Sequence, residues 1–378
     1  MKKERILYLI IFALFFTFCA DDKSKITVNE INFKSISIEE TGVKNFMDSG
    51  KIKKIVKLET NDDSLIGNID SIKIAENGDI LVGDFYSSKK VLRFDKDGKY
   101  IQSYGKVGRG PGEHVSIKNF DILPDGSIIF LTDLKVIKYA RSGQLLNEIR
   151  TNFIPLDIAV LDDFIYISHV GFRMSPRTDE SILIFNSDLK KIGGLLEFDT
   201  RLEKYRYIPS NFFAKINQKL YFIGNYSFNL YEYDPKFSTL NCLEIPSENS
   251  TLNSIWEKKN LSESDYGEIK KRLHRFNFIY GFRDGLFLLE FCAEKRIFDY
   301  WVFNLGRRKA KVFKYAAEYF KNNLFFNKFV GSGDGCIIGV FNDNENFNTY
   351  KDNFPELKDI EFNIEDNPIL AFFEFDVF

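Results

Sequence analysis

Side chains that carry most catalytic and metal chemistry are scarce in this chain. It contains only 3 histidines, 3 methionines and 4 cysteines in 378 residues, and no histidine has a second ligand at a spacing typical of metal sites. The GxSxG motif of serine hydrolases is absent. These absences weigh against an enzyme, and the sequence predicts neither a cofactor nor a metal site.

The cysteines are too few and too scattered for a disulfide framework. Cys242, Cys292 and Cys336 follow the N-terminal segment, and this odd number contains no CxxC pair. All three stand in strand-like runs of apolar residues. We therefore expect them to be buried apolar side chains rather than disulfide partners or zinc ligands.

Large net charge and long apolar runs are missing as well. The formal net charge of −2 argues against binding to nucleic-acid phosphates. No segment approaches 18 consecutive apolar residues, so the sequence predicts no membrane-spanning helix. Aromatic residues, in contrast, are abundant at 16%, with 40 phenylalanines and 18 tyrosines. Aromatic and β-branched residues favour strands, so we predict an all-β fold.

The N-terminus has the pattern of an export signal. Lys2, Lys3 and Arg5 precede the apolar segment Ile6–Phe18, which is too short to span a bilayer but typical of a signal peptide. Cys19 follows directly. A cysteine at this point resembles the lipobox of bacterial lipoproteins, in which the thiol is acylated. The alternative is an ordinary secretory signal followed by an unrelated cysteine.

This reading divides the chain into three parts. Residues 1–18 are a signal peptide, residues 19–51 a lipid-anchored tether, and residues 52–378 a folded body. The acidic pair Asp21 and Asp22 resembles the surface-export signal of some Gram-negative lipoproteins. We therefore expect a protein of the cell envelope, lipid-anchored to the outer membrane, with exposure at the cell surface as a further possibility.

The folded body repeats a unit of four short strands. In the first unit, the turns Asn77-Gly78 and Asp97-Gly98 separate apolar segments, and such pairs favour tight hairpins because glycine adopts positive φ. The predicted strands of this unit are Ile69–Ala75, Ile80–Phe85, Val91–Asp95 and Tyr100–Tyr104. Comparable units recur about every 40 residues, which is typical of a β-propeller.

The sixth and last unit lacks one strand. Its C-terminal segment Ile369–Phe375 has no following partner, whereas Ile52–Leu58 precedes the first unit without a unit of its own. We therefore predict a six-bladed β-propeller of four-stranded antiparallel blades, closed by the N-terminal strand in the last blade.

Four segments carry a resemblance to a known family. They are Val56-Lys57-Leu58-Glu59-Thr60, Leu65-Ile66-Gly67-Asn68-Ile69, Gly105-Lys106-Val107-Gly108-Arg109-Gly110-Pro111-Gly112-Glu113 and Asn367-Pro368-Ile369-Leu370. They resemble six-bladed β-propeller lipoproteins of Gram-negative bacteria that are NHL- and TolB-like in architecture. The resemblance covers residues 52–378 and implies a fold and an address in the envelope rather than a reaction.

Strand alternation sorts the connections onto two faces. Turns within hairpins, such as 76–79 and 124–126, are short and share one face, while the other face carries the insertions 105–116, 169–181 and 246–274. Insertions gathered on one face commonly mark the binding face. Within the last insertion, Ser262 and Asp265 form a capping pattern that predicts a short helix.

Candidate ligand-binding residues lie on this second face. The glycine-rich run is expected to be a tight turn between blades, because it lacks the spacing and following helix of a phosphate loop. Its turn glycines are Gly105, Gly108, Gly110 and Gly112. The candidates for ligand contact are Arg109, Glu113, His114, His169, Arg173, Arg177, Tyr205 and Arg206.

Two functions follow from this pattern. In the first, an anchored propeller binds a glycan, peptide or protein partner on its loop-rich face, because arginine and tyrosine suit carboxylates and sugar rings. In the second, the chain is a hydrolase or lyase with its site at the mouth of the channel. A cluster of acids with shifted pKa at the centre of the ring would favour the second.

Overall fold

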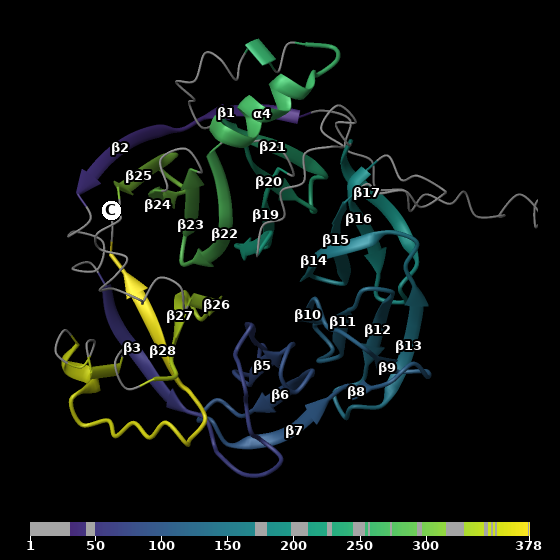
Figure 1. Cartoon of the computed structure of the whole chain (residues 1–378), viewed down its shortest axis with the longest axis vertical. Helices are drawn as coiled ribbons and strands as arrows, with labels where there is room; N and C mark the ends of the chain where they lie inside the picture. The colour runs from purple at the N-terminus through teal and green to yellow at the C-terminus, as the bar shows by residue number, and fades with distance from the viewer. Residues whose placement is uncertain are drawn as a thin grey trace, which may run out of the picture.

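A computed structural model gives the fold as sheets arranged radially around one centre (Figure 1). Only one long helix, α4 (Glu263–Arg272), occurs in the described part of the chain. Ser262 caps it as predicted: its hydroxyl accepts a hydrogen bond from the Asp265 amide at 3.3 Å. The structure describes residues 31–42, 50–170, 180–197, 211–224, 229–244, 254–255, 258–272, 274–292, 297–314, 329–343, 347–348, 351, 354–376 and 378.

In these residues, the strands form six antiparallel units of four. The first unit contains β4 (Ser71–Ile74), β5 (Ile80–Asp84), β6 (Lys90–Phe94) and β7 (Tyr100–Tyr104), and the second contains β10 (Asn119–Ile122), β11 (Ile128–Leu131), β12 (Lys135–Tyr139) and β13 (Leu145–Arg150). The third contains β14 (Ile154–Leu161), β15 (Phe164–Val170), β16 (Glu180–Asn186) and β17 (Lys191–Glu197), and the fourth contains β18 (Phe213–Ile216), β19 (Lys219–Ile223), β20 (Leu230–Asp234) and β21 (Thr239–Glu244). The fifth contains β22 (His274–Phe282), β23 (Gly285–Cys292), β24 (Ile297–Asn304) and β25 (Lys309–Lys314), and the sixth contains β26 (Phe329–Gly333), β27 (Cys336–Phe341), β28 (Ile369–Phe375) and β3 (Gly50–Lys57).

The predicted closure by an N-terminal strand is confirmed. β3 pairs antiparallel with β28, so that Lys57 lies opposite Ile369 and Gly50 lies opposite Phe375. Ile52 and Val56 of β3 are buried, at 5% and 2% exposure, whereas Lys51, Lys53 and Lys57 are exposed. The first and sixth units also join directly through the parallel pair Gly331–Ile72.

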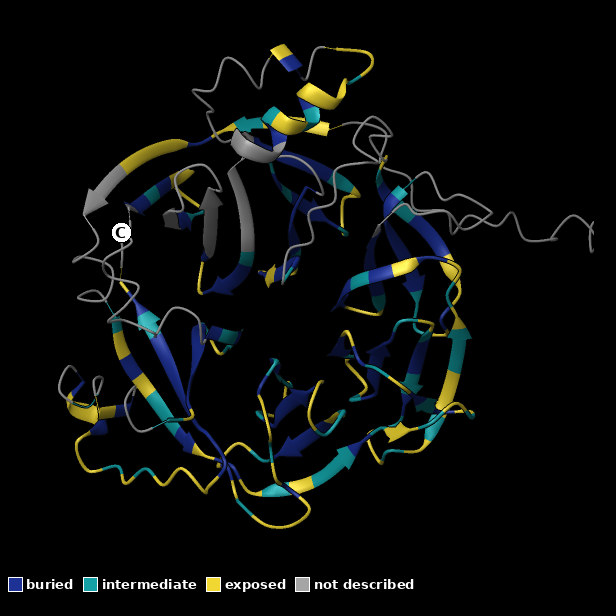
Figure 2. Cartoon of the chain, in the orientation of Figure 1, coloured by how far each residue is buried: buried dark blue, intermediate teal, exposed yellow. Residues whose placement is uncertain are grey.

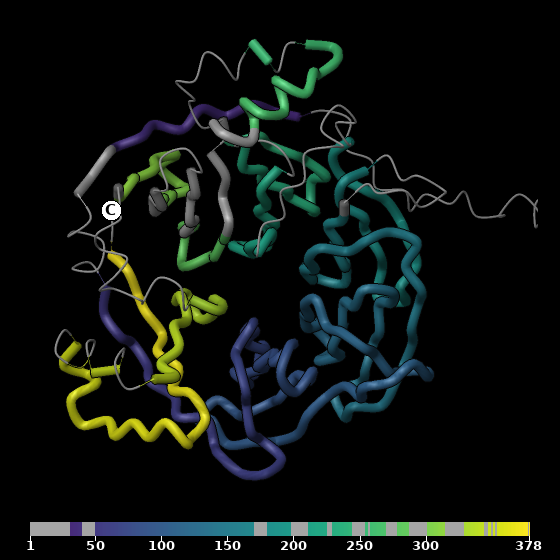
Figure 3. The backbone as a smooth tube through the Cα atoms, in the orientation of Figure 1, coloured from purple at the N-terminus to yellow at the C-terminus, as the bar shows by residue number. Residues whose placement is uncertain are grey.

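Part of the segment expected to be a tether forms strands instead. β1 (Ile31–Ser35) pairs parallel with β21, and β2 (Ser37–Gly42) pairs parallel with β25. The chain therefore runs along the outside of the fourth and fifth units before it enters the sixth (Figure 3). Ile36, between the two strands, is 5% exposed and packs into the cluster that joins those units. We call residues 31–42 the belt.

The hydrophobic core lies between neighbouring units rather than in one central mass. Each buried cluster joins two units; one, for example, contains Ile129 of β11 and Ile165 of β15. The inner strands are mostly buried, whereas outer strands such as β13 contain only exposed and half-buried residues (Figure 2). Cys242 and Cys336 are buried and are not in a disulfide, as the sequence predicts. No helix among the described residues is long and apolar enough to cross a membrane.

The connections divide between two faces in the way that strand alternation requires. We call the face with the hairpin turns 75–79, 123–127, 162–163 and 217–218 the short-turn face. The opposite, long-connection face carries segments such as 58–70, 105–118 and 342–368. Because Gly50 pairs with Phe375, the start of β3 and the end of β28 both lie at the short-turn face.

Candidate functional site: two cavities at the centre of the ring

The first strand of every unit lies at the centre. β4, β10, β14, β18, β22 and β26 contact one another in this order around the ring, and β26 contacts β4 again. Side chains on the inward side of these strands therefore face a common axis. A cavity opens at each end of this axis, one on each face.

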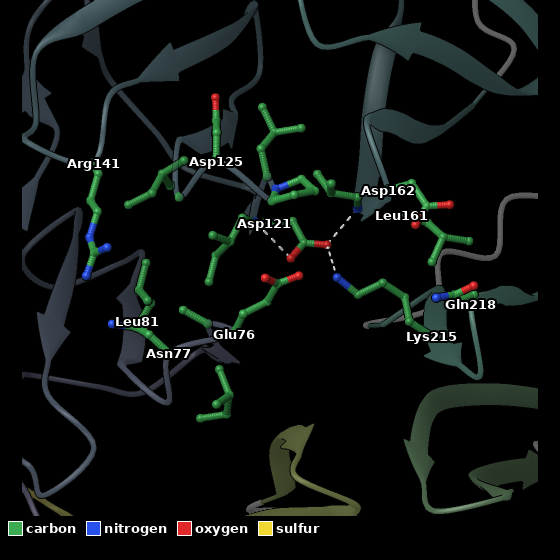
Figure 4. A pocket seen from close by; sticks show the side chains of 18 of the residues that line it. Glu76, Asn77, Leu81, Asp121, Asp125, Arg141, Leu161, Asp162, Lys215 and Gln218 are labelled. Atoms are coloured by element: carbon green, nitrogen blue, oxygen red, sulfur yellow. Dashed lines mark hydrogen bonds and ion pairs between the residues drawn. The ribbon is translucent and has the colours of Figure 1, made fainter.

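The cavity at the short-turn face has a volume of about 530 Å³. It is lined by the first turns of four consecutive units, including residues 74–77, 121–126, 160–162 and 215–218. Figure 4 shows Asp121 at its centre, with Lys215 and Glu76 turned toward it. The cavity therefore contains charges of both signs.

Asp121 connects the inner strands of three units. Its carboxylate accepts a hydrogen bond from the Val160 amide at 2.6 Å and one from Lys215 Nζ at 2.8 Å. Burial by itself would raise the pKa of Asp121, but the positive charges of Lys215 and Lys73 and these hydrogen bonds outweigh it and lower the pKa. Asp121 is therefore a buried anion at neutral pH.

Asp157 makes a similar connection between the second, third and fourth units. It accepts hydrogen bonds from Asn119 Nδ2 at 2.5 Å, the Phe212 amide at 2.7 Å and the Ile158 amide at 2.8 Å. Burial raises the pKa of Asp157, and this effect exceeds the opposing attraction of Lys73. Both central acids are thus held by donors of the protein itself.

The rim of this cavity also carries ionic groups. Arg93 donates from Nε to Asp79 at 2.7 Å, and both side chains are buried. Arg141 Nη2 lies 3.5 Å from the same carboxylate, and the Arg141 side chain is 57% exposed. Glu76 is exposed and has no hydrogen bond or ion pair with the described residues.

The cavity at the long-connection face has a volume of about 420 Å³ and a different chemistry. Tyr86 projects at its edge with 81% exposure. Asn68 Nδ2 donates to Asp70 at 2.5 Å, and Asp70 also accepts from the Phe85 amide at 2.6 Å. Burial raises the pKa of Asp70 above its usual value. Other residues that line it are Lys118, Asn119, Asn211, Phe278, Tyr280 and Asn342.

The glycine-rich run lies at the periphery, beside the second unit, and not beside either cavity (Figure 1). It contains the short parallel strands β8 (Lys106–Val107) and β9 (Glu113–His114). Tyr139 donates to the Gly112 carbonyl at 2.6 Å, and Lys135 donates to the Gly110 carbonyl at 2.9 Å. Gly105 and Gly112 have φ of 95° and 66°. The run thus connects the first and second units and is held against β12.

Three of the candidate ligand residues belong to this run. Glu113 accepts from the Gly110 amide at 2.9 Å and pairs with Lys106 at 2.9 Å, in the space where Gly108 would carry a side chain. His114 is 3% exposed, its Nε2 lies 2.9 Å from the Lys89 carbonyl, and its ring packs against Phe130. Arg109 alone of the three is exposed.

Among the remaining candidates, His169 lies within the described residues. His169 is 1% exposed, with Nε2 at 2.8 Å from the Glu180 carbonyl and the ring against Phe153. The others lie outside the described residues and stay predictions: Cys19, Arg173, Arg177, Tyr205 and Arg206.

Sequence reasoning missed the polar residues of the inner strands. Asn119 and Asp121 alternate with apolar residues in β10, Asp157 lies within the apolar β14, and Lys215 lies within β18. A charged residue inside an otherwise apolar strand was the available signal, because such a residue is rarely buried without a partner. Only the radial arrangement shows that these four side chains gather near one axis.

Four-stranded antiparallel sheets whose first strands surround a common axis define a β-propeller. The family described as Domain of unknown function (DUF4934) matches residues 29–374, and the chain belongs to this family.

A solved structure of similar fold supports this assignment. A Bacteroides fragilis protein described as exported has a TM-score of 0.64 at 17% identity, covering 92% of this chain and all of its own. BamB from Moraxella catarrhalis has a TM-score of 0.38 at 12% identity, covering 71% of this chain and 79% of its own. None of the curated proteins matches this chain by sequence. The narrower NHL- and TolB-like likeness stays a prediction.

Proposed function

We propose that this chain is an exported, lipid-anchored propeller that binds a glycan or protein partner on its long-connection face. The observation that supports this most directly is the cavity of about 420 Å³ on that face, which combines amide side chains with aromatic residues, among them the exposed ring of Tyr86. Aromatic rings stack on the apolar faces of sugars, while amides both donate to and accept from hydroxyl groups. A volume of this size suits a small-molecule site.

Binding rather than catalysis is favoured by the state of the central acids. Asp121 and Asp157 each accept backbone amide hydrogen bonds that connect inner strands, so their carboxylates stabilise the fold. A hydrolase or lyase is the second candidate, supported by Asp70. Its raised pKa and its position at the cavity are properties that a general acid needs.

The proposed cellular location rests on the N-terminal sequence. A basic start, a short apolar segment and Cys19 form the lipoprotein pattern, and the Bacteroides fragilis protein with the same fold is described as exported. The lipid anchor and the outer membrane as its location are part of the proposal.

A panel of immobilised glycans and envelope proteins tests the proposal, with purified chain beginning at residue 20 as the probe. For the ligand found, Tyr86→Ala should weaken binding about tenfold, equivalent to roughly 1.4 kcal/mol, because the exposed ring would no longer stack. Gln218→Ala, at the opposite cavity, is the matched control and should leave the affinity unchanged.

Two results would redirect the proposal. If Gln218→Ala weakens binding while Tyr86→Ala does not, the partner binds the short-turn face. If the hit is cleaved during incubation and Asp70→Asn stops the cleavage, the chain is the enzyme of the second candidate.

A further inference from the structure

The cavity at the short-turn face has features of a binding site in its own right. All of its lining comes from the first four units, and the inner strands β4, β10, β14 and β18 contribute to it. Its volume of about 530 Å³ falls within the range of small-molecule sites. It lies at the opposite end of the axis from the long-connection face, so this inference does not depend on the function proposed above.

Lys215 offers hydrogen-bond donors to this cavity. Its ammonium group has three donors, and the structure shows one of them on Asp121 at 2.8 Å. The side chain is 36% exposed, so the remaining donors are accessible from the cavity. Asp121 is buried and fixed by backbone amides, and it therefore holds the ammonium group in place.

Glu76 offers the complementary charge. It lines the same cavity from the turn after β4, and Figure 4 shows its carboxylate turned toward Asp121 and Lys215. No described residue gives this carboxylate a hydrogen bond or an ion pair. Since Asp121 and Lys215 already balance each other, Glu76 is an additional anion with free acceptor positions.

The walls exclude ligands that rely on stacking. The described residues that line this cavity include aliphatic side chains such as Leu81, Leu161 and Ile216, but no aromatic ring. The opposite cavity has Tyr86, Phe278 and Tyr280. A sugar ring or a nucleobase would find aromatic partners only at the long-connection face.

We propose that the short-turn cavity binds a compact zwitterion, a free amino acid or a short peptide with charged ends. The ligand carboxylate binds the free donors of Lys215, and the ligand ammonium binds Glu76. Arg141 at the rim supplies a second cation for the carboxylate of a longer peptide, since Asp79 holds it at 3.5 Å while more than half of its side chain stays exposed. The two ligand charges act together: the carboxylate uses the donors of Lys215 that Asp121 leaves free, and the ammonium group gives Glu76 a partner among the charged groups.

Calorimetric titration of the mature full chain tests this proposal with defined probes. Glycine, L-alanine and alanyl-alanine are compared with ethylamine and acetate up to about 10 mM, since a small polar site is expected to bind in the millimolar range. The zwitterions should bind at least tenfold more tightly than either singly charged probe. Tighter binding of alanyl-alanine identifies a peptide ligand, and tighter binding of L-alanine identifies a free amino acid.

The main variant is Glu76→Gln, because Glu76 is exposed and its replacement leaves the internal contacts intact. It should weaken zwitterion binding about tenfold. Asp163→Asn removes an exposed acid that lies on the same face but does not line the cavity, so the affinity should stay the same. Tyr86→Ala should also leave the affinity for the zwitterions unchanged.

Three results would overturn the proposal. They are the absence of zwitterion binding, equal binding of ethylamine or acetate, and unchanged affinity in the Glu76→Gln variant. A loss of glycan or protein binding on the long-connection face would not bear on it. The two proposals therefore fail separately.

Discussion

Asp121 and Asp157 show how a single buried charge is stabilised in the centre of this ring. Both side chains accept amide hydrogen bonds from a neighbouring unit, but their pKa values move in opposite directions. The difference lies in Lys215, which contacts Asp121 directly at 2.8 Å. A central acid with an adjacent ammonium group is stabilised as an anion, whereas burial dominates for an acid without one.

We predict that Asp121→Asn lowers the free energy of unfolding by about 2–4 kcal/mol at pH 7, because Lys215 loses its buried partner. The folded-state pKa of Asp121 is lowered, so its stabilisation is present above the unfolded-state pKa and is lost as the pH falls through the folded-state pKa. The difference in unfolding free energy between Asp121→Asn and the parent, measured by urea unfolding, should therefore be smaller at pH 3 than at pH 7. Asp163→Asn, on an exposed turn, is the control. Equal stability of Asp121→Asn and the parent at pH 7 would contradict this assignment.

Gly105 tests the packing of the glycine-rich run. A Cβ atom there would lie 2.6 Å from His114 Cε1 and 2.9 Å from Phe130 Cε2, and φ is +95°. Gly143 has a similar φ of +88°, but the nearest atom to its Cβ would be 4.0 Å away. Gly105→Ala should cost about 2–3 kcal/mol in thermal or urea unfolding, and Gly143→Ala about 1 kcal/mol, because only the first adds a clash to the backbone strain. Equal losses of unfolding free energy in the two variants would show that the positive φ alone sets the cost of the substitution.

At the scale of the elements, β3 and the belt should contribute very differently to stability. β3 supplies the fourth strand of the sixth unit and buries Ile52 and Val56, whereas β1 is mostly exposed. Removing residues 1–49 should lower Tm by a few degrees, equivalent to about 1–2 kcal/mol. Removing residues 1–58 should abolish the cooperative transition, because β28 would become an unpaired edge and the core between the sixth and first units would lose Val56 and Leu58. Similar melting of both truncated chains would show that closure does not depend on β3.

At the scale of the whole molecule, the belt limits how far the folded body can lie from a membrane to which Cys19 is anchored. Only residues 20–30 separate Cys19 from β1, and a chain of this length extends to about 40 Å at most. We predict that Cys19→Ser moves the protein from the membrane fraction to the soluble fraction, because the acylated thiol would be lost. Immunoblots of fractionated cells measure this, with Cys242→Ser, a buried cysteine, as the control. An unchanged distribution would exclude lipidation at Cys19.

Much of the architecture could be predicted from the sequence by itself. Hairpin turns such as Asn77-Gly78 and Asp125-Gly126 fixed the strand boundaries, since few residues other than glycine adopt the required φ at low cost. The count of strands then predicted closure between Ile52–Leu58 and the last unit, which the register of β3 with β28 confirms. These features depend on local backbone preference and on the alternation of buried and exposed residues along strands. Both properties are determined by residues that are close together in the sequence.

The tertiary structure alone decided which side chains meet. His114 and His169 looked like candidates for ligand contact, yet both are buried against aromatic rings. Asp121 and Lys215 are 94 residues apart and form an ion pair because β10 and β18 both face the axis. The belt strands likewise pair with β21 and β25, about 200 or more residues away in the chain. Such contacts depend on the radial packing of whole units, and no short sequence pattern encodes that packing.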